Sequence, residues 1–156
     1  MSSARNQLYV KKIRSGTVID HIDPGHALDV LHILNITGKK GELVSAVLNV
    51  ESKQLERKDI VKIEDRELNP QEVDKIALIA PKATINIIRE YEVISKKHVE
   101  FPRTIKGIIR CNNPSCVVNA REPVTPEFKV ETAEPLTIRC HYCGRIMGKD
   151  DVLKQF

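Results

Sequence analysis

Four cysteines in the last third of the chain constrain its fold more than any other feature. Their spacing is C-x4-C followed by C-x2-C: Cys111 and Cys116 form the first pair, and Cys140 and Cys143 form the second. Each pair fits a tight turn that directs two sulfur atoms to one point, and two such turns complete a tetrahedral shell of four thiolates. The spacing predicts one structural metal ion per chain, and Zn2+ fits this ligand set best.

Other uses of the four cysteines stay open from the sequence alone. Disulfides need an oxidising compartment, a redox dithiol needs only one C-x2-C pair, and an iron site uses the same ligands as zinc. Asn112, Asn113, Pro114 and Gly144 supply turn-forming residues around the two pairs. His141 lies between two cysteines, but four sulfurs already close the shell, so we expect it at the surface. A closed shell leaves no position for substrate, which indicates a structural role rather than a catalytic one.

The cysteines also divide the chain into two parts. A segment of about 50 residues buries too little apolar surface to fold alone, and a bound metal can supply the missing free energy. We therefore expect a small antiparallel β domain of the zinc-ribbon type over residues 103–156. A first domain covers residues 1–102, with a linker around residues 101–103.

The first hundred residues carry the pattern of an α+β fold. Asp23, as a cap before Pro24, predicts a helix to about residue 35, and Asn69-Pro70 predicts a second helix that ends before Pro81. Runs rich in β-branched residues predict strands over 17–22, 43–50, 59–63, 82–88 and 91–94, with a further edge strand at 8–10. The order of these elements is that of a ferredoxin-like domain, an antiparallel sheet with two helices on one face. Its other face is open to a ligand.

Composition narrows the partners of such a chain. The 25 basic and 21 acidic residues give a net charge of +4, and aromatic residues make up only 4% of the chain. A nucleic-acid-binding protein with a ferredoxin-like domain and a zinc ribbon is the alternative reading, but sparse aromatics and a small net charge disfavour it. No apolar run is long enough to span a membrane, and the start of the chain has no secretory signal, so we expect a cytoplasmic protein.

Polar residues interrupt the apolar strands of the predicted sheet. A lysine is a point-charge donor to phosphate oxygens, and several lysines converging from different strands would bind a triphosphate. Ordinary solvated side chains are the alternative for each residue taken singly. No nucleophile with a matching base is evident, which argues against an active site. The residues in question are Asp20, His21, Lys58, Lys62, Asn86 and Lys96.

Five features in register identify a family. The strings GTVIDHI at 16–22, RKDIVKIE at 57–64, APKATIN at 80–86 and YEV at 91–93, together with the cysteine spacing, resemble the regulatory chain of aspartate carbamoyltransferase. The resemblance covers nearly the whole chain. It implies a non-catalytic chain that joins catalytic chains in pyrimidine synthesis, with three regulatory dimers holding two catalytic trimers. It further implies that the first domain binds CTP, ATP or UTP and that the zinc domain contacts a catalytic chain, with no nucleic acid or membrane as partner.

The resemblance also implies roles for single residues. The ribose would lie near Asp20 and Lys62, the phosphates near His21 and Lys96, and a second nucleotide near Lys58. The base would lie against the segment at residues 10–13 and the strand at 91–94. Two residues of the strand at 82–88 would line the pocket. The residues implied for the base and the lining are Val10, Lys11, Lys12, Ile13, Asn86, Ile88, Tyr91 and Val93. Lys11-Lys12 departs from the family pattern of an acidic and then a small residue, and contacts there are expected to be mainly with the main chain.

Overall fold

Five antiparallel strands and two helices make up the first part of the chain in the computed structural model, which describes residues 12–53 and 55–156. The strand order in the sheet is β2-β3-β1-β4-β5. This confirms the ferredoxin-like arrangement, with β5 added as a hairpin partner of β4. The elements are β1 (Gly16–Ile22), α1 (Ala27–Ile33), β2 (Val44–Ser52), β3 (Glu56–Glu64), α2 (Pro70–Ile79), β4 (Thr84–Arg89) and β5 (Glu92–His98). The edge strand predicted at 8–10 lies outside the described residues.

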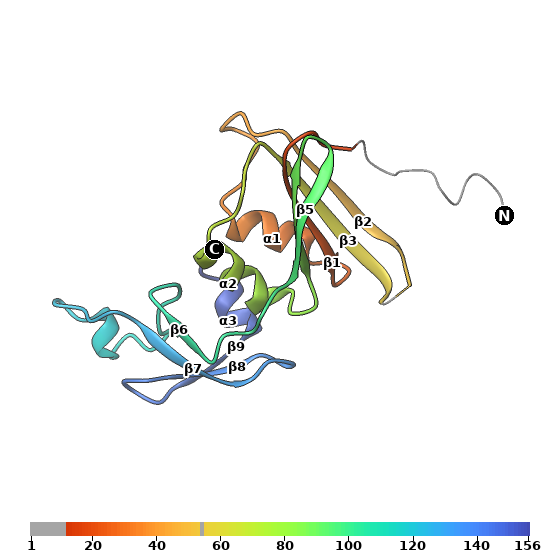
Figure 1. Ribbon diagram of the computed structural model, residues 1–156. Helices are drawn as coiled ribbons and strands as arrows, with labels where there is room; N and C mark the ends of the chain where they lie inside the picture. The colour runs from red at the N-terminus through yellow and green to blue at the C-terminus, as the bar shows by residue number, and fades with distance from the viewer. Residues whose placement is uncertain (1–11, 54) are drawn as a thin grey trace.

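Both helices cover the same face of this sheet (Figure 1). The start of α2 confirms the prediction: Asn69 caps the helix, Pro70 is its first residue, and the Asn69 side chain accepts from the backbone N–H of Glu72 at 2.9 Å. Buried residues of α1 and α2 pack on those of β1 and β3 in one apolar cluster. No helix formed by residues 12–53 and 55–156 covers the opposite face of the sheet.

The prediction for the start of α1 was wrong. Asp23 does not cap the helix, which begins only at Ala27. Its place is taken by Asp59 of β3, whose carboxylate accepts from the backbone N–H groups of Gly25 (3.0 Å), Ala27 (3.1 Å) and Asn49 (2.8 Å). Asp59 is therefore a buried cap from a distant strand.

The fifth strand is longer than its sequence indicates. We expected it to end at residue 94, but β5 continues to His98 because β4 pairs with it as far as Thr84 opposite His98. Two lysines in a row are poor strand formers, and pairing with a buried neighbour strand overrides that preference. The extension places Lys96 inside a strand.

The second part of the chain is a four-stranded antiparallel sheet in the order β6-β7-β8-β9, which confirms the small β domain. A short 3-10 helix (Val117–Asn119) follows the first cysteine pair, and a short α-helix ends the chain. The elements are β6 (Thr104–Lys106), β7 (Glu127–Thr132), β8 (Thr137–Cys140), β9 (Ile146–Gly148) and α3 (Lys149–Leu153).

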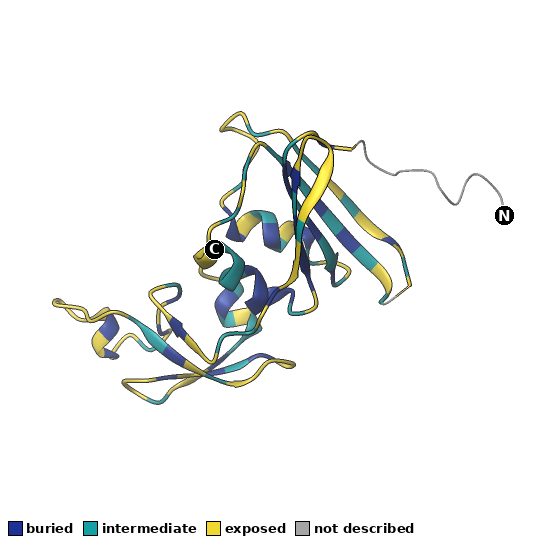
Figure 2. Cartoon of the chain, viewed as in Figure 1, coloured by how far each residue is buried: buried dark blue, intermediate teal, exposed yellow. Residues whose placement is uncertain are grey.

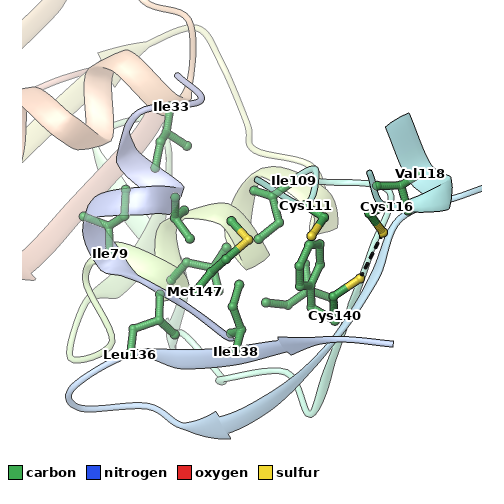
Figure 3. Packing of buried hydrophobic residues seen from close by; sticks show 14 residues of the cluster. Ile33, Ile79, Ile109, Cys111, Cys116, Val118, Leu136, Ile138, Cys140 and Met147 are labelled. Carbon is green, nitrogen blue, oxygen red and sulfur yellow. Dashed lines mark hydrogen bonds between the residues drawn. The ribbon is translucent and has the colours of Figure 1, made fainter. Parts of the chain in front are cut away.

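The apolar core of the second sheet extends into the first part. Ile33 of α1 and Ile79 of α2 belong to the same cluster as Ile138 and Met147 of the second sheet (Figure 3). The two parts thus share buried side chains instead of being joined only by a linker. By contrast with the buried residues of this core, strand β5 is largely exposed (Figure 2). No helix among the described residues is long and apolar enough to cross a membrane.

Candidate functional site

The four cysteines come together at one end of the second sheet. All four Sγ atoms lie within 4.8 Å of one another, and the Cys111–Cys143 separation is 3.6 Å. The Cys116–Cys140 separation, marked in Figure 3, is also 3.6 Å. A disulfide would need about 2.05 Å. Four thiolates at about 2.3 Å from one Zn2+ place their sulfurs about 3.8 Å apart, so this donor set fits a tetrahedral metal ion.

Local turns hold the sulfurs in this arrangement. Asn113 accepts from the N–H of Ser115 at 3.0 Å, and its own N–H points to the Cys111 sulfur at 3.5 Å. Gly144, with φ +76°, donates to the carbonyl of Cys140 at 3.0 Å. A positive φ favours glycine, which is why glycine follows the second pair. Asn113 and Gly144 thus have the turn-forming role that the sequence predicted.

The thiols differ strongly in their readiness to lose a proton. Burial raises the pKa of Cys111 to about 12 and also raises that of Cys116, whereas the backbone N–H of Arg145 is the main cause that lowers the pKa of the exposed Cys143 to about 6. A metal ion must therefore displace protons from the buried thiols when it binds. Among the described residues, these cysteines are the one group suited to hold a metal, and the exposed His141 is not part of it.

A row of polar side chains crosses the helix-free face of the first sheet. Val18 of β1 pairs with Lys62 of β3 on one side and with Asn86 of β4 on the other, and Asn86 pairs with Lys96 of β5. Asn86 donates from Nδ2 to the carbonyl of Val18 at 3.3 Å. Register thus brings Lys62, Asn86 and Lys96 into one line across four strands.

A second group lies beside this row at the end of β1. The Lys58 ammonium is 2.9 Å from Oδ1 of Asp20, and the His21 ring nitrogen Nδ1 is 3.2 Å from the hydroxyl of Thr84. A bulge between Ile19 and Ile22 gives His21 a φ of +58°, and Asp20 holds this bend by accepting from the His21 N–H at 2.6 Å. Because of the bulge, the consecutive residues Asp20 and His21 both contribute side chains to the same region.

The close approach of these groups shifts the pKa values of two of them. Burial lowers the pKa of His21; Asp20 opposes this, and Lys58, Lys96 and His98 lower it further. Burial also lowers the pKa of Lys62, and Lys12 adds a smaller effect in the same direction. Several cationic groups therefore converge with Asp20 as their anionic neighbour, which is an environment that favours an anionic ligand.

The residues implied for the base lie around the margin of this face. Tyr91 and Val93, in the β4–β5 hairpin, are 60% and 57% exposed, whereas Ile13 and Ile88 are buried. Lys12 is exposed just before β1. Val10 and Lys11 lie outside the described residues.

Two polar residues of this face were missed from the sequence. Thr84 contacts His21, and His98 lies close enough to affect its pKa. Both stand two positions from a predicted site residue, Asn86 and Lys96, and side chains of a strand return to the same face every second residue. That alternation predicts Thr84 from Asn86. It would also have predicted His98 from Lys96 if the full length of β5 had been expected.

An apolar groove lies elsewhere, on the helix side of the same sheet. It has a volume of about 720 Å3 and is bounded by the start of α2, β4 and β5. Lys97 lines it, because this residue points away from the face that carries Lys96. Of the residues predicted for the nucleotide, none of those that the structure describes lines this groove.

Comparison with known proteins gives matches over nearly the whole chain. Residues 8–100 match the family "Aspartate carbamoyltransferase regulatory chain, allosteric domain", and residues 103–153 match "Aspartate carbamoyltransferase regulatory chain, metal binding domain". Relatives named aspartate carbamoyltransferase regulatory chain include those of Hyperthermus butylicus (55% identical over 149 residues, 95% of this chain and 93% of the relative) and Korarchaeum cryptofilum (55% over 152 residues, 97% of each). The chain of Saccharolobus solfataricus is 51% identical over 154 residues, covering 99% of this chain and 97% of the relative.

Proposed function

Because the chain belongs to the family of aspartate carbamoyltransferase regulatory chains, which are the non-catalytic subunits of that enzyme, we propose that it binds nucleotide effectors and passes their effect to the catalytic chains. The effectors are CTP, ATP and UTP, and the reaction controlled is a step of pyrimidine biosynthesis. The working assembly is a cytoplasmic dodecamer of two catalytic trimers and three regulatory dimers.

The convergence of polar side chains on the helix-free face carries this proposal. Lys62, Asn86 and Lys96 share one row, and Asp20, His21 and Lys58 lie beside it. Lysine ammonium groups and a histidine suit phosphate oxygens, and a carboxylate suits ribose hydroxyls. A nucleoside triphosphate offers both kinds of group in one molecule.

The proposed roles follow this chemistry. His21 and Lys96 face the phosphates, Asp20 and Lys62 meet the ribose, and Lys58 serves a second nucleotide. The base lies at the exposed hairpin of Tyr91 and Val93, along the segment 10–13, with Asn86 and Ile88 lining the pocket. The ion pair between Lys58 and Asp20 couples the two nucleotide positions, because a ligand that takes the Asp20 carboxylate releases the Lys58 ammonium.

The four-cysteine site has a structural role in this proposal. Residues 103–156 form a domain whose fold depends on one zinc ion held by Cys111, Cys116, Cys140 and Cys143, and residues 1–102 form the nucleotide domain. Zinc supplies the cross-link that keeps the two cysteine turns together. The folded domain then presents the surface that contacts a catalytic chain.

Regulation in this scheme is a coupling between sites on different chains. A nucleotide can shift the enzyme between two arrangements only to the extent that it binds them with different affinity. The first part of the chain supplies the nucleotide site, and the second part supplies the surface that contacts a catalytic chain. The core shared by the two parts is the physical connection between them.

A pair of neighbouring lysines tests the nucleotide site. Lys96→Ala is expected to weaken CTP binding by about 10-fold or more, because a charge-assisted contact is worth about 1.5–3 kcal/mol. Lys97→Ala is the matched control, since Lys97 lies on the same strand but lines the groove on the other face. Isothermal titration of the full chain with CTP and with cytidine measures both variants.

Two results would contradict the nucleotide proposal. Equal losses of CTP and cytidine affinity in Lys96→Ala would remove the phosphate assignment. Binding of single-stranded RNA with a steep dependence on salt, in place of CTP binding, would favour the nucleic-acid-binding alternative.

A further inference from the structure

A polar contact joins the two parts of the chain beside their shared core. Nε2 of His26, the residue before α1, lies 3.0 Å from the Nζ of Lys149, the first residue of α3. The other ring nitrogen of His26, Nδ1, lies 2.9 Å from Oδ2 of Asp29. His26 therefore bridges a carboxylate in the first part and an ammonium in the second.

The chemistry of these three groups fixes the direction of the bridge. A lysine ammonium has donors and no acceptor, so Nε2 of His26 must accept from Lys149. Nδ1 then carries the proton and donates it to the Asp29 carboxylate. The ring is neutral in this arrangement, and both of its nitrogens are used.

His26 lies at the end of a segment that begins on the nucleotide face. Asp20 and His21 precede it by six and five residues, and the turn between them is held at its far end by Asp59 through Gly25 and Ala27. The His26 N–H also donates to the carbonyl of Asp23 at 3.1 Å. A displacement at Asp20 or His21 is thus carried to His26 by a short turn whose backbone is hydrogen-bonded at several points.

Strand β3, which pairs with β1, also connects the nucleotide face with the start of α1. Lys58, the ion-pair partner of Asp20 on the nucleotide face, directly precedes Asp59, which caps α1 on the helix side. Because successive strand residues point to opposite faces, β3 links the two sides of the sheet at this position. Two adjacent routes therefore connect the nucleotide face with the start of α1.

The boundary between the two parts is not fully packed at this contact. A cavity of about 230 Å3 lies against Lys149 and is bounded by both parts of the chain. Interfaces of this kind can hold two discrete arrangements of the packed elements. The residues around the cavity include Asp23, Leu78, Ile79 and Pro81 from the first part and Pro135 and Leu136 from the second.

We propose that the His26–Lys149 contact is the link through which a nucleotide on the open face repositions the metal-binding domain. This inference rests on the proposed function. His26 and Lys149 are positioning residues: they act on the second domain and do not touch the nucleotide.

Lys149→Met in the assembled enzyme tests the link, since methionine keeps much of the side-chain length and loses the ammonium. We expect the effect of CTP on the carbamoyltransferase rate to fall at least threefold, with the rate in the absence of nucleotide unchanged. The CTP dissociation constant of the isolated full-length variant chain is expected to stay within twofold of wild type. Lys149→Arg keeps a donor for His26 and is expected to restore most of the CTP effect.

Lys75→Met is the matched control. The Lys75 ammonium lies over the ring of Phe156, 5.7 Å from its centre, so this variant removes a different contact between α2 and the end of the chain. It leaves the His26 turn untouched, and we expect it to keep the response to CTP. A His26→Ala, Lys149→Met double variant is expected to lose no more than Lys149→Met alone, because the two residues act as one unit.

The outcomes separate this inference from the proposed function. An unchanged CTP effect in Lys149→Met, or an equal loss in Lys75→Met, would overturn the link while leaving nucleotide regulation in place. A wild-type chain that binds no CTP would overturn the proposed function, and the inference with it.

Discussion

At the scale of single residues, His21 is where backbone geometry and charge meet in the proposed nucleotide site. Its backbone is in the left-handed region at φ +58°, and its ring contacts Thr84. Burial is the main cause that lowers its pKa; Asp20 opposes this, and Lys58, Lys96 and His98 add to the lowering. Histidine is one of the residue types found more often than most at positive φ, so the bulge is accessible to it. The bend places the ring beside the cluster of charged side chains.

His21 predicts how nucleotide binding depends on pH. Its lowered pKa keeps the ring neutral in the free protein at pH 7.5, and nearby phosphate charge would favour the imidazolium form. CTP binding is therefore expected to take up protons, and the affinity is expected to rise as the pH falls from 7.5 towards 6. Isothermal titration in buffers of different ionisation enthalpy measures the proton uptake.

A histidine outside the sheet supplies the control for this prediction. His21→Asn is expected to lose most of the pH dependence, leaving the part that comes from protonation of the nucleotide itself. His141→Asn, which changes an exposed histidine of the second domain, is expected to behave like wild type. The same pH dependence in His21→Asn and wild type would contradict the assignment of His21 to the phosphates.

At the scale of elements, the start of α1 depends on a strand that is distant in the sequence. The helix has seven residues and no side-chain cap of its own, and Asp59 of β3 accepts from the N–H of its first residue, Ala27, and from that of Gly25 in the preceding turn. The same carboxylate accepts from Asn49 of β2. One buried side chain therefore fixes α1 against two strands.

Asp59→Ala is expected to lower the free energy of unfolding by about 3 kcal/mol, because it removes a buried carboxylate that accepts from three N–H groups and leaves the buried one, that of Ala27, without an acceptor. Asp59→Asn keeps one acceptor oxygen and is expected to lose less. Urea unfolding of the metal-loaded chain measures both. Glu51→Ala, an exposed carboxylate on β2, is the control and is expected to stay within about 0.5 kcal/mol of wild type. A similar small loss for Asp59→Ala would show that water replaces the buried carboxylate.

At the scale of the whole molecule, the second part of the chain, which carries the four cysteines, is packed onto the first part through a common core. Phe128 and Ile138 of the second sheet belong to the same buried cluster as Ile33 and Leu78 of the two helices. The cysteines Cys111, Cys116 and Cys140 lie in that cluster as well. Loss of the metal is therefore expected to reach beyond the four ligands.

Cys140→Ser, or removal of the metal with a chelator, is expected to unfold residues 103–156 and to release the chain from its catalytic partner. The first sheet should keep its strands but lose protection at the buried ends of α1 and α2. Metal analysis, size-exclusion chromatography and hydrogen exchange measure these three effects. His141→Ala, next to Cys140 but outside the cluster, should change none of them. A metal-free Cys140→Ser chain that stays assembled would refute the structural role of the metal.

The sequence by itself determined the features that depend on residues close together in the chain. The cysteine turns, the cap of α2 by Asn69 and the order of strands and helices all follow from local spacing, and the structure bears them out. Local alternation also places polar side chains of different strands on one face of the sheet, once the strands are placed. Lys62, Asn86 and Lys96 lie in one row as a result.

Only the tertiary structure decided what depends on contacts between distant residues. Asp59 resembles a surface charge in the sequence, and its role as a cap appears only when β3 lies beside α1, 32 residues away from Ala27. His26 and Lys149 are separated by 123 residues, and no local pattern predicts that they meet. Burial and register bring such pairs together, since the free energy of packing the whole sheet outweighs the preferences of any single segment.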